Sequence, residues 1–96
     1  MAAYAIFIRE EPVRDPAEIE IYQKKAAGGG AAFNMKLLAL YGACQAVEGK
    51  AVDGVVLLEF PTLEDAKAWY NSPAYQAAAP HRRKGAEYRA ILFEGR

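Results

Sequence analysis

Residues 69–95, WYNSPAYQAAAPHRRKGAEYRAILFEG, say more about the fold than any other stretch of the chain. A helix ends near Tyr70, and Ser72-Pro73 supplies the N-cap and first-turn residues of a third, shorter helical segment. Pro80 predicts an interruption or a kink, because its ring clashes with the preceding helical turn. Residues 90–93 are apolar, and the closing strand is predicted over residues 88–94. The run also holds the only histidine and a basic cluster, so polar side chains could converge here beside an apolar wall.

The first third of the chain predicts one strand and one helix. An apolar run rich in aromatic and β-branched residues begins at Tyr4, which favours a strand over residues 3–10. Asp15, Pro16 and Glu18 are the residue types expected at the N-cap, first and third positions of a helix. The glycines at 28–30 end this helix and begin a mobile connection.

The middle of the chain predicts two more strands and a second helix. Residues 35–47 favour a long strand, bent by a bulge at Gly42. After a turn, residues 55–60 form the third strand. Thr62, followed three residues later by an acid, opens a helix over residues 62–70.

The predicted order of elements is β-α-β-β-α-β, with a helical extension before the last strand. This order is typical of an α+β, ferredoxin-like domain with a four-stranded antiparallel sheet, here a single domain over residues 1–96. Residues 6–8, 55–58 and 90–93 are apolar on both faces of that sheet, while two helices cover only one face. We therefore expect a homodimer in which two sheets face each other; the alternative is an outer face lined by a ligand.

Composition excludes several classes of function. The 12 basic and 12 acidic residues cancel, which argues against a general nucleic-acid binder, and residues 55–60 lack the Gly-aromatic signature of RNA-binding sheets. Cys44 is the only cysteine, so no intramolecular disulfide can form, and one Cys with one His makes no metal cluster. The apolar start is too short to cross a membrane. We expect a cytoplasmic protein with no nucleic-acid or membrane partner.

Four motifs resemble a known family. They are E-F-P-T at residues 59–62, W-Y-x-S-P-x-Y-Q at residues 69–76, Arg82, and the terminal E-G at residues 94–95. Together they resemble the DUF1330 family of small uncharacterised proteins over essentially the full chain. The resemblance implies a dimeric α+β barrel, a superfamily that includes cofactor-free oxygenases, isomerases, decarboxylases and haem enzymes beside proteins without known activity. The fold therefore transfers and the function does not.

The sequence departs from the commoner family pattern around its second strand. Many members have Gly-Gly before this strand and Arg-Gly-Gly within it, whereas the matching positions here are Asn34-Met35 and Leu40-Tyr41-Gly42. One family arginine is therefore missing, so a ligand site here cannot use it.

Glu59 and His81 are the candidate catalytic residues. The carboxylate of Glu59 lies in an apolar strand, where burial would raise its pKa and suit it to act as a base. His81 is the one side chain that ordinarily titrates near neutral pH. Each also has a structural interpretation: Glu59 as a strand-end carboxylate paired with an arginine or reaching solvent, and His81 as a favourable charge at a helix end.

Arg82 and Tyr75 are the candidate substrate-binding residues. The guanidinium of Arg82 could hold a carboxylate with two parallel hydrogen bonds, or it could form a salt bridge to Glu59, to Glu87 or to a partner subunit. The hydroxyl of Tyr75 is the one most suited to face a cleft.

Two functions follow from these residues. The first is a small-molecule-binding protein, or a cofactor-independent enzyme, with a cleft between sheet and helices lined by Glu59, Tyr75, His81 and Arg82. The second is a non-catalytic dimeric binding or accessory module in which the same side chains form an ion-pair network. No metal and no cofactor is expected, because a haem could bind only through His81 and nothing else indicates a haem pocket.

Overall fold

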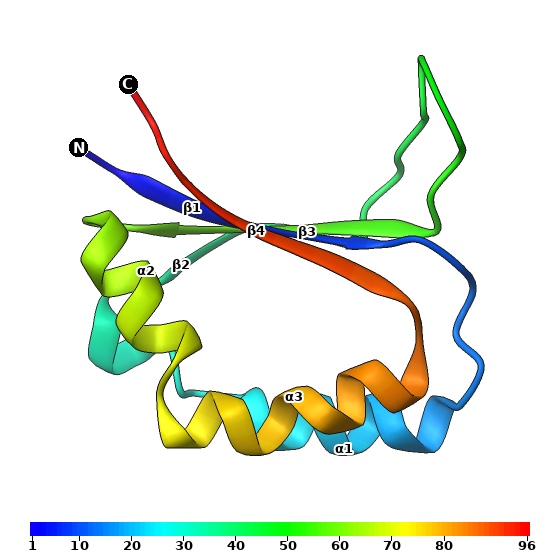
Figure 1. Ribbon diagram of the computed structural model, residues 1–96, viewed down its shortest axis with the longest axis horizontal. Coiled ribbons are helices and arrows are strands. Elements are labelled where there is room, and N and C mark those ends of the chain that lie inside the picture. Colours follow the sequence, from blue (N-terminus) through cyan, green and yellow to red (C-terminus); the bar gives the residue numbers. More distant parts are fainter.

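The computed structural model describes residues 1–96 as one antiparallel sheet with three α-helices on one of its faces (Figure 1). The order of the strands across the sheet is β2-β3-β1-β4, as expected for the predicted ferredoxin-like α+β fold. The strands are β1 (Ala3–Arg9), β2 (Lys36–Leu40), β3 (Gly54–Phe60) and β4 (Tyr88–Glu94). The helices are α1 (Pro16–Ala26), α2 (Leu63–Tyr70) and α3 (Pro73–Gly85), with a short 3₁₀ turn, η1 (Ala31–Phe33).

All three α-helices begin where the sequence predicts. The side chain of Asp15 accepts a hydrogen bond from the backbone N–H of Glu18 at the start of α1. Thr62 and Ser72 accept in the same way from amides three residues later, at 3.1 and 3.3 Å. Each cap satisfies an amide that has no partner inside its helix.

Strand β2 is much shorter than predicted. It ends at Leu40 instead of residue 47, and its bulge lies between Leu37 and Ala39 rather than at Gly42. The strand stops because Tyr41 adopts a left-handed backbone with φ of 51°, which turns the chain out of the sheet. Residues 42–53 form a loop that projects on the side away from the helices (Figure 1).

Helix α3 is longer than predicted and continues through Pro80. It has 13 residues, and Pro80 lies on its exposed side. The proline removes one helical hydrogen bond. However, α1 packs along α3, and Ala78 and Ala79 of α3 are buried. Tertiary packing therefore overrides the local preference to break.

The core lies between the sheet and one end of the helix layer. Strand alternation directs Phe7 and Phe60 toward the helices, where they meet Trp69 and Tyr75. The rings of Trp69 and Tyr75 are 4.3 Å apart. Helix α2 covers this end of the sheet, whereas α1 packs on α3 and not directly on the sheet (Figure 1).

The other face of the sheet carries no helix (Figure 1). Its central row is apolar, because Ile6 pairs with Leu57 on one side and with Ile91 on the other. Ile91 is 46% exposed, and the neighbouring Phe93 is 40% exposed. None of the helices is long and apolar enough to cross a bilayer.

Candidate ligand-binding cavity

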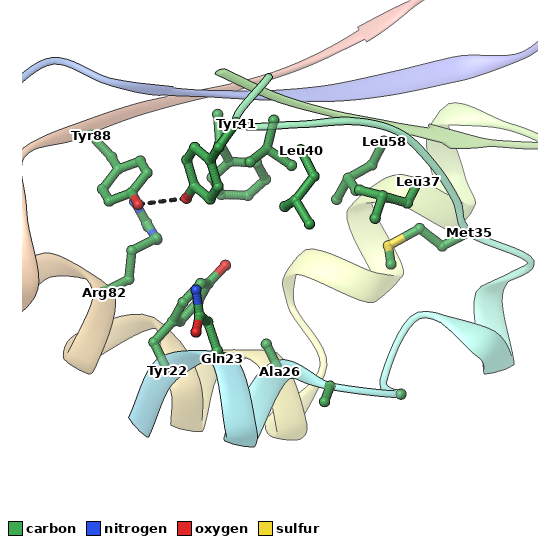
Figure 2. Close-up of a pocket in the computed structure, with 14 residues that line it drawn as sticks. Tyr22, Gln23, Ala26, Met35, Leu37, Leu40, Tyr41, Leu58, Arg82 and Tyr88 are labelled. Carbon is green, nitrogen blue, oxygen red and sulfur yellow. Dashed lines mark hydrogen bonds between the residues drawn. The ribbon is translucent and has the colours of Figure 1, made fainter. Parts of the chain in front are cut away.

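A cavity of about 390 Å³ opens between the sheet and α1 (Figure 2). This volume is within the range of small-molecule sites. Strands β1, β2 and β3 form its roof, α1 forms its floor, and residues of α3 and β4 close one end. Of the 14 residues that line it, 11 are hydrophobic. The lining comprises Phe7, Tyr22, Gln23, Ala26, Ala27, Gly28, Met35, Leu37, Leu40, Tyr41, Val56, Leu58, Arg82 and Tyr88.

The cavity exists because the edge strand β2 has no helix packed directly against it. Leu37 and Leu40 lie on the same face of the sheet as the buried Leu58 and Val56, their register partners in β3. They are nevertheless 54% and 59% exposed. Leu40 occupies the position at which the family pattern has arginine, so this part of the wall is aliphatic instead of charged.

Arg82 is the only charged residue in the cavity lining. It is 4% exposed, and its guanidinium carbon lies 5.3 Å from the ring centre of Phe7 and 5.1 Å from that of Tyr88. Its Nε has no hydrogen-bond partner, and the side chain takes part in none of the ion pairs of the protein. Stacking on aromatic rings favours a cation, but it leaves this N–H donor unused.

Two tyrosines lie beside Arg82 at this end of the cavity. The hydroxyls of Tyr41 and Tyr88 share a hydrogen bond of 2.6 Å (Figure 2). Arg9 stacks on the ring of Tyr41 at 4.3 Å and donates to the hydroxyl of Tyr88 at 3.5 Å. Arg9 also forms an ion pair with Asp53 at 2.7 Å. Arg9 therefore has a carboxylate partner, and Arg82 does not.

A second tyrosine pair lies between α1 and α3. The hydroxyls of Tyr22 and Tyr75 are 3.0 Å apart. Burial is the main cause that raises the pKa of Tyr22, Tyr41 and Tyr75 above the ordinary tyrosine value. For Tyr75, the hydrogen bond to Tyr22 and the charge of Arg82 act in the opposite direction. All three hydroxyls therefore keep their protons at neutral pH and can donate hydrogen bonds.

The prediction that Glu59, Tyr75, His81 and Arg82 line one cleft is wrong, since only Arg82 lines the cavity. Tyr75 is 2% exposed and lies behind Tyr22, so its hydroxyl does not face open space. Glu59 points to the outer face beside Tyr4, because its neighbours in β3 point inward and strand side chains alternate.

His81 packs against α1 instead of facing the cavity. Successive helical residues are about 100° apart, so the residue before the inward-facing Arg82 points sideways. The His81 Nδ1 lies 2.5 Å from a carboxylate oxygen of Glu18. This contact joins α3 to α1. The predicted alternative network is also absent, since neither Glu59 nor Glu87 forms an ion pair with Arg82.

The sequence patterns did not indicate Tyr22 and Tyr41 as residues of the cavity lining, nor Arg9 as the residue that contacts Tyr41 and Tyr88. Tyr22 has a signal, because it shares a helix face with Ile19 and Ala26, and that face points toward the sheet. Tyr41 has none, since the sequence pattern places it inside a continuous strand. No group of three or more His, Cys, Asp or Glu side chains is positioned to hold a metal.

The family described as "Domain of unknown function (DUF1330)" matches residues 2–96, and the chain belongs to this family. No curated protein matches the sequence.

Solved structures share the fold at low sequence identity. A protein of unknown function from Rhodopseudomonas palustris has a TM-score of 0.76 at 14% identity, covering 99% of this chain and 82% of that one. A dimeric ferredoxin-like protein of unknown function from Thermobifida fusca has 0.64 at 17%, covering 99% and 92%. A cofactor-independent oxygenase from Streptomyces nogalater has 0.58 at 15%, covering 99% and 92%. At these identities the similarity establishes the fold alone.

Proposed function

We propose that the protein binds a small, largely apolar molecule in the cavity between the sheet and α1. One observation carries this proposal: a cavity of about 390 Å³ with a mainly hydrophobic lining has a single buried charge at one end. Ligand sites commonly combine an apolar wall with a few placed polar groups. Here those groups are Arg82, Tyr22, Tyr41, Tyr88 and Gln23.

The geometry favours binding over acid–base catalysis by the protein. The lining contains no carboxylate, histidine, lysine or cysteine, and the raised pKa values of Tyr22 and Tyr41 keep both hydroxyls protonated at neutral pH, so they are not available as proton acceptors. Catalytic roles for His81 and Glu59 stay predictions without support from this arrangement. A cofactor-independent reaction of the bound molecule is the second candidate, because a structural neighbour is named as a cofactor-independent oxygenase.

In this proposal residues 1–96 act as one domain and assemble as a homodimer through the outer faces of two sheets. The apolar row of Ile6, Leu57 and Ile91 supports it, as does a structural neighbour that is named as dimeric. We place the protein in the cytoplasm, where the exposed thiol of Cys44 would stay reduced. The alternative remains a non-catalytic accessory module that uses the same dimer.

Binding of N-phenyl-1-naphthylamine, a neutral apolar dye, tests the proposal. We expect the dye to fluoresce with saturable binding at one site per chain. Ala26→Trp should abolish this binding, because Ala26 lines the cavity and an indole there fills it. Ala17→Trp places the same side chain on an exposed position of α1 and should leave binding unchanged. Equal dye binding by both variants would contradict the proposal.

A further inference from the structure

We infer that the cavity takes an organic monocarboxylate with an aliphatic tail, with its carboxylate against Arg82 and the Tyr41–Tyr88 pair. This inference rests on the proposed function and names its ligand class. Figure 2 shows the arrangement that suggests it: Arg82, Tyr41 and Tyr88 lie at one end, and Met35, Leu37 and Leu58 lie at the other.

The buried guanidinium is the first part of the argument. A charge removed from water needs a partner, and Arg82 has neither an ion pair nor a partner for its Nε. Arg9, which is more exposed, has one in Asp53. A planar carboxylate matches the fork of donors on a guanidinium, and a ligand carboxylate would supply the ion-pair partner that Arg82 lacks.

The tyrosine pair is the second part. Two hydroxyls that share one hydrogen bond use one proton between them, and Tyr88 also accepts from Arg9. The pair therefore retains one O–H that can donate elsewhere. Burial raises the pKa of Tyr41, so the hydroxyl of Tyr41 keeps its proton at neutral pH. A carboxylate oxygen near Arg82 would accept it.

The lining at the far end of the cavity indicates the chemistry of the ligand's tail. Ala26, Met35, Leu37, Leu40 and Leu58 supply aliphatic surface there, and no second charged residue lines the cavity. An alkyl chain is the complement of this surface, since it gains by leaving water and asks for no hydrogen bond. A second carboxylate would have no partner at that end.

Competition against N-phenyl-1-naphthylamine tests the inference with two probes of the same chain length. We expect octanoate to bind the wild-type protein at least about tenfold more tightly than 1-octanol, as measured by displacement of the dye. A hydrogen bond to a charged group contributes more than one between neutral groups. Equal affinities would overturn the carboxylate inference and leave the proposed function standing. If the dye itself does not bind, both fail.

Arg82→Met tests whether Arg82 is the residue that prefers octanoate over 1-octanol. This variant should still bind the dye and 1-octanol but should lose the preference for octanoate. Arg83→Met, which removes the same charge from the next and exposed residue of α3, should keep the preference. A preference that survives in Arg82→Met would contradict the assignment of Arg82.

A measurement on the wild-type protein covers the case in which Arg82→Met does not fold. Octanoate labelled with carbon-13 at the carboxyl carbon reports its own protonation by NMR. A carboxylate beside a guanidinium should titrate at lower pH when bound than when free. An unchanged or raised titration midpoint in the bound state would overturn the inference.

Discussion

The two faces of the sheet are both apolar and both incompletely covered, yet they differ in shape and in charge. The helix face is hollow beside β2, and a buried arginine and three tyrosines line the hollow. The outer face has an apolar central row and no helix above it. A hollow with one unpaired charge suits a small molecule with one charged group, whereas an extended apolar face suits a second copy of the chain. Strand alternation alone separates the two, because each strand contributes to both faces.

A charge on the outer face should have the largest effect. Ile91→Glu puts a carboxylate into the apolar row of the proposed dimer contact, on the edge strand β4, where it would be buried without a partner. We expect the dimer to dissociate into monomers at micromolar concentration, as measured by light scattering. Ala17→Glu adds the same charge to an exposed site on α1 and should remain dimeric. A wild-type protein that is already monomeric would contradict the dimer.

High pH should lower the stability of the protein through the buried tyrosines on the helix side of the sheet. A tyrosine whose pKa is raised by folding stabilises the protein fully below the unfolded value of about 10, and this contribution is lost as the pH rises toward the folded value. Each such group should reduce the free energy of unfolding by about 1.4 kcal/mol per pH unit in that window. Urea denaturation between pH 9 and 11 should therefore show a steep loss of stability, and Tyr22→Phe should make it shallower. An unchanged slope in Tyr22→Phe would contradict the role of burial.

Removing the contact between His81 and Glu18 should change the stability of the protein least. Both side chains are partly exposed, so His81→Gln should cost less than about 1 kcal/mol of stability. Octanoate binding should not change, because His81 lies outside the cavity. Glu18→Gln should have the same effect, and the double variant should cost no more than either single one. A loss of octanoate binding in His81→Gln would return this histidine to the site.

The parts of the fold with local signals were predictable from the sequence. The caps at Asp15, Thr62 and Ser72 mark the helix starts, and β4 occupies the predicted residues 88–94 around the apolar run at residues 90–93. The wrong predictions concern elements whose ends depend on tertiary contacts. Tyr41 ends β2 by a backbone conformation that its residue type does not favour, and packing between α1 and α3 carries α3 past Pro80.

The site was harder to predict than the fold. Arg82 was a candidate from its family motif, but its neighbours come from β1, α1, β4 and the end of β2, which no sequence spacing relates. Glu59 and His81 are candidates because of their chemistry, but neither side chain faces the cavity. Each lies one position along its strand or helix from a residue that points inward. Residue type thus identified the candidate residues, and only the three-dimensional arrangement showed which of them lines the cavity.

The free energy of unfolding of ligand-free Arg82→Met tests the central claim most directly, because a residue kept for its ligand need not stabilise the fold. Replacing an unpaired buried charge by an apolar side chain of similar length should leave stability unchanged or raise it by about 1–3 kcal/mol, at the same protein concentration as wild type. Added octanoate should then stabilise the wild-type protein more than the variant. A loss of several kcal/mol in the ligand-free variant, with octanoate stabilisation intact, would show instead that Arg82 holds the core together.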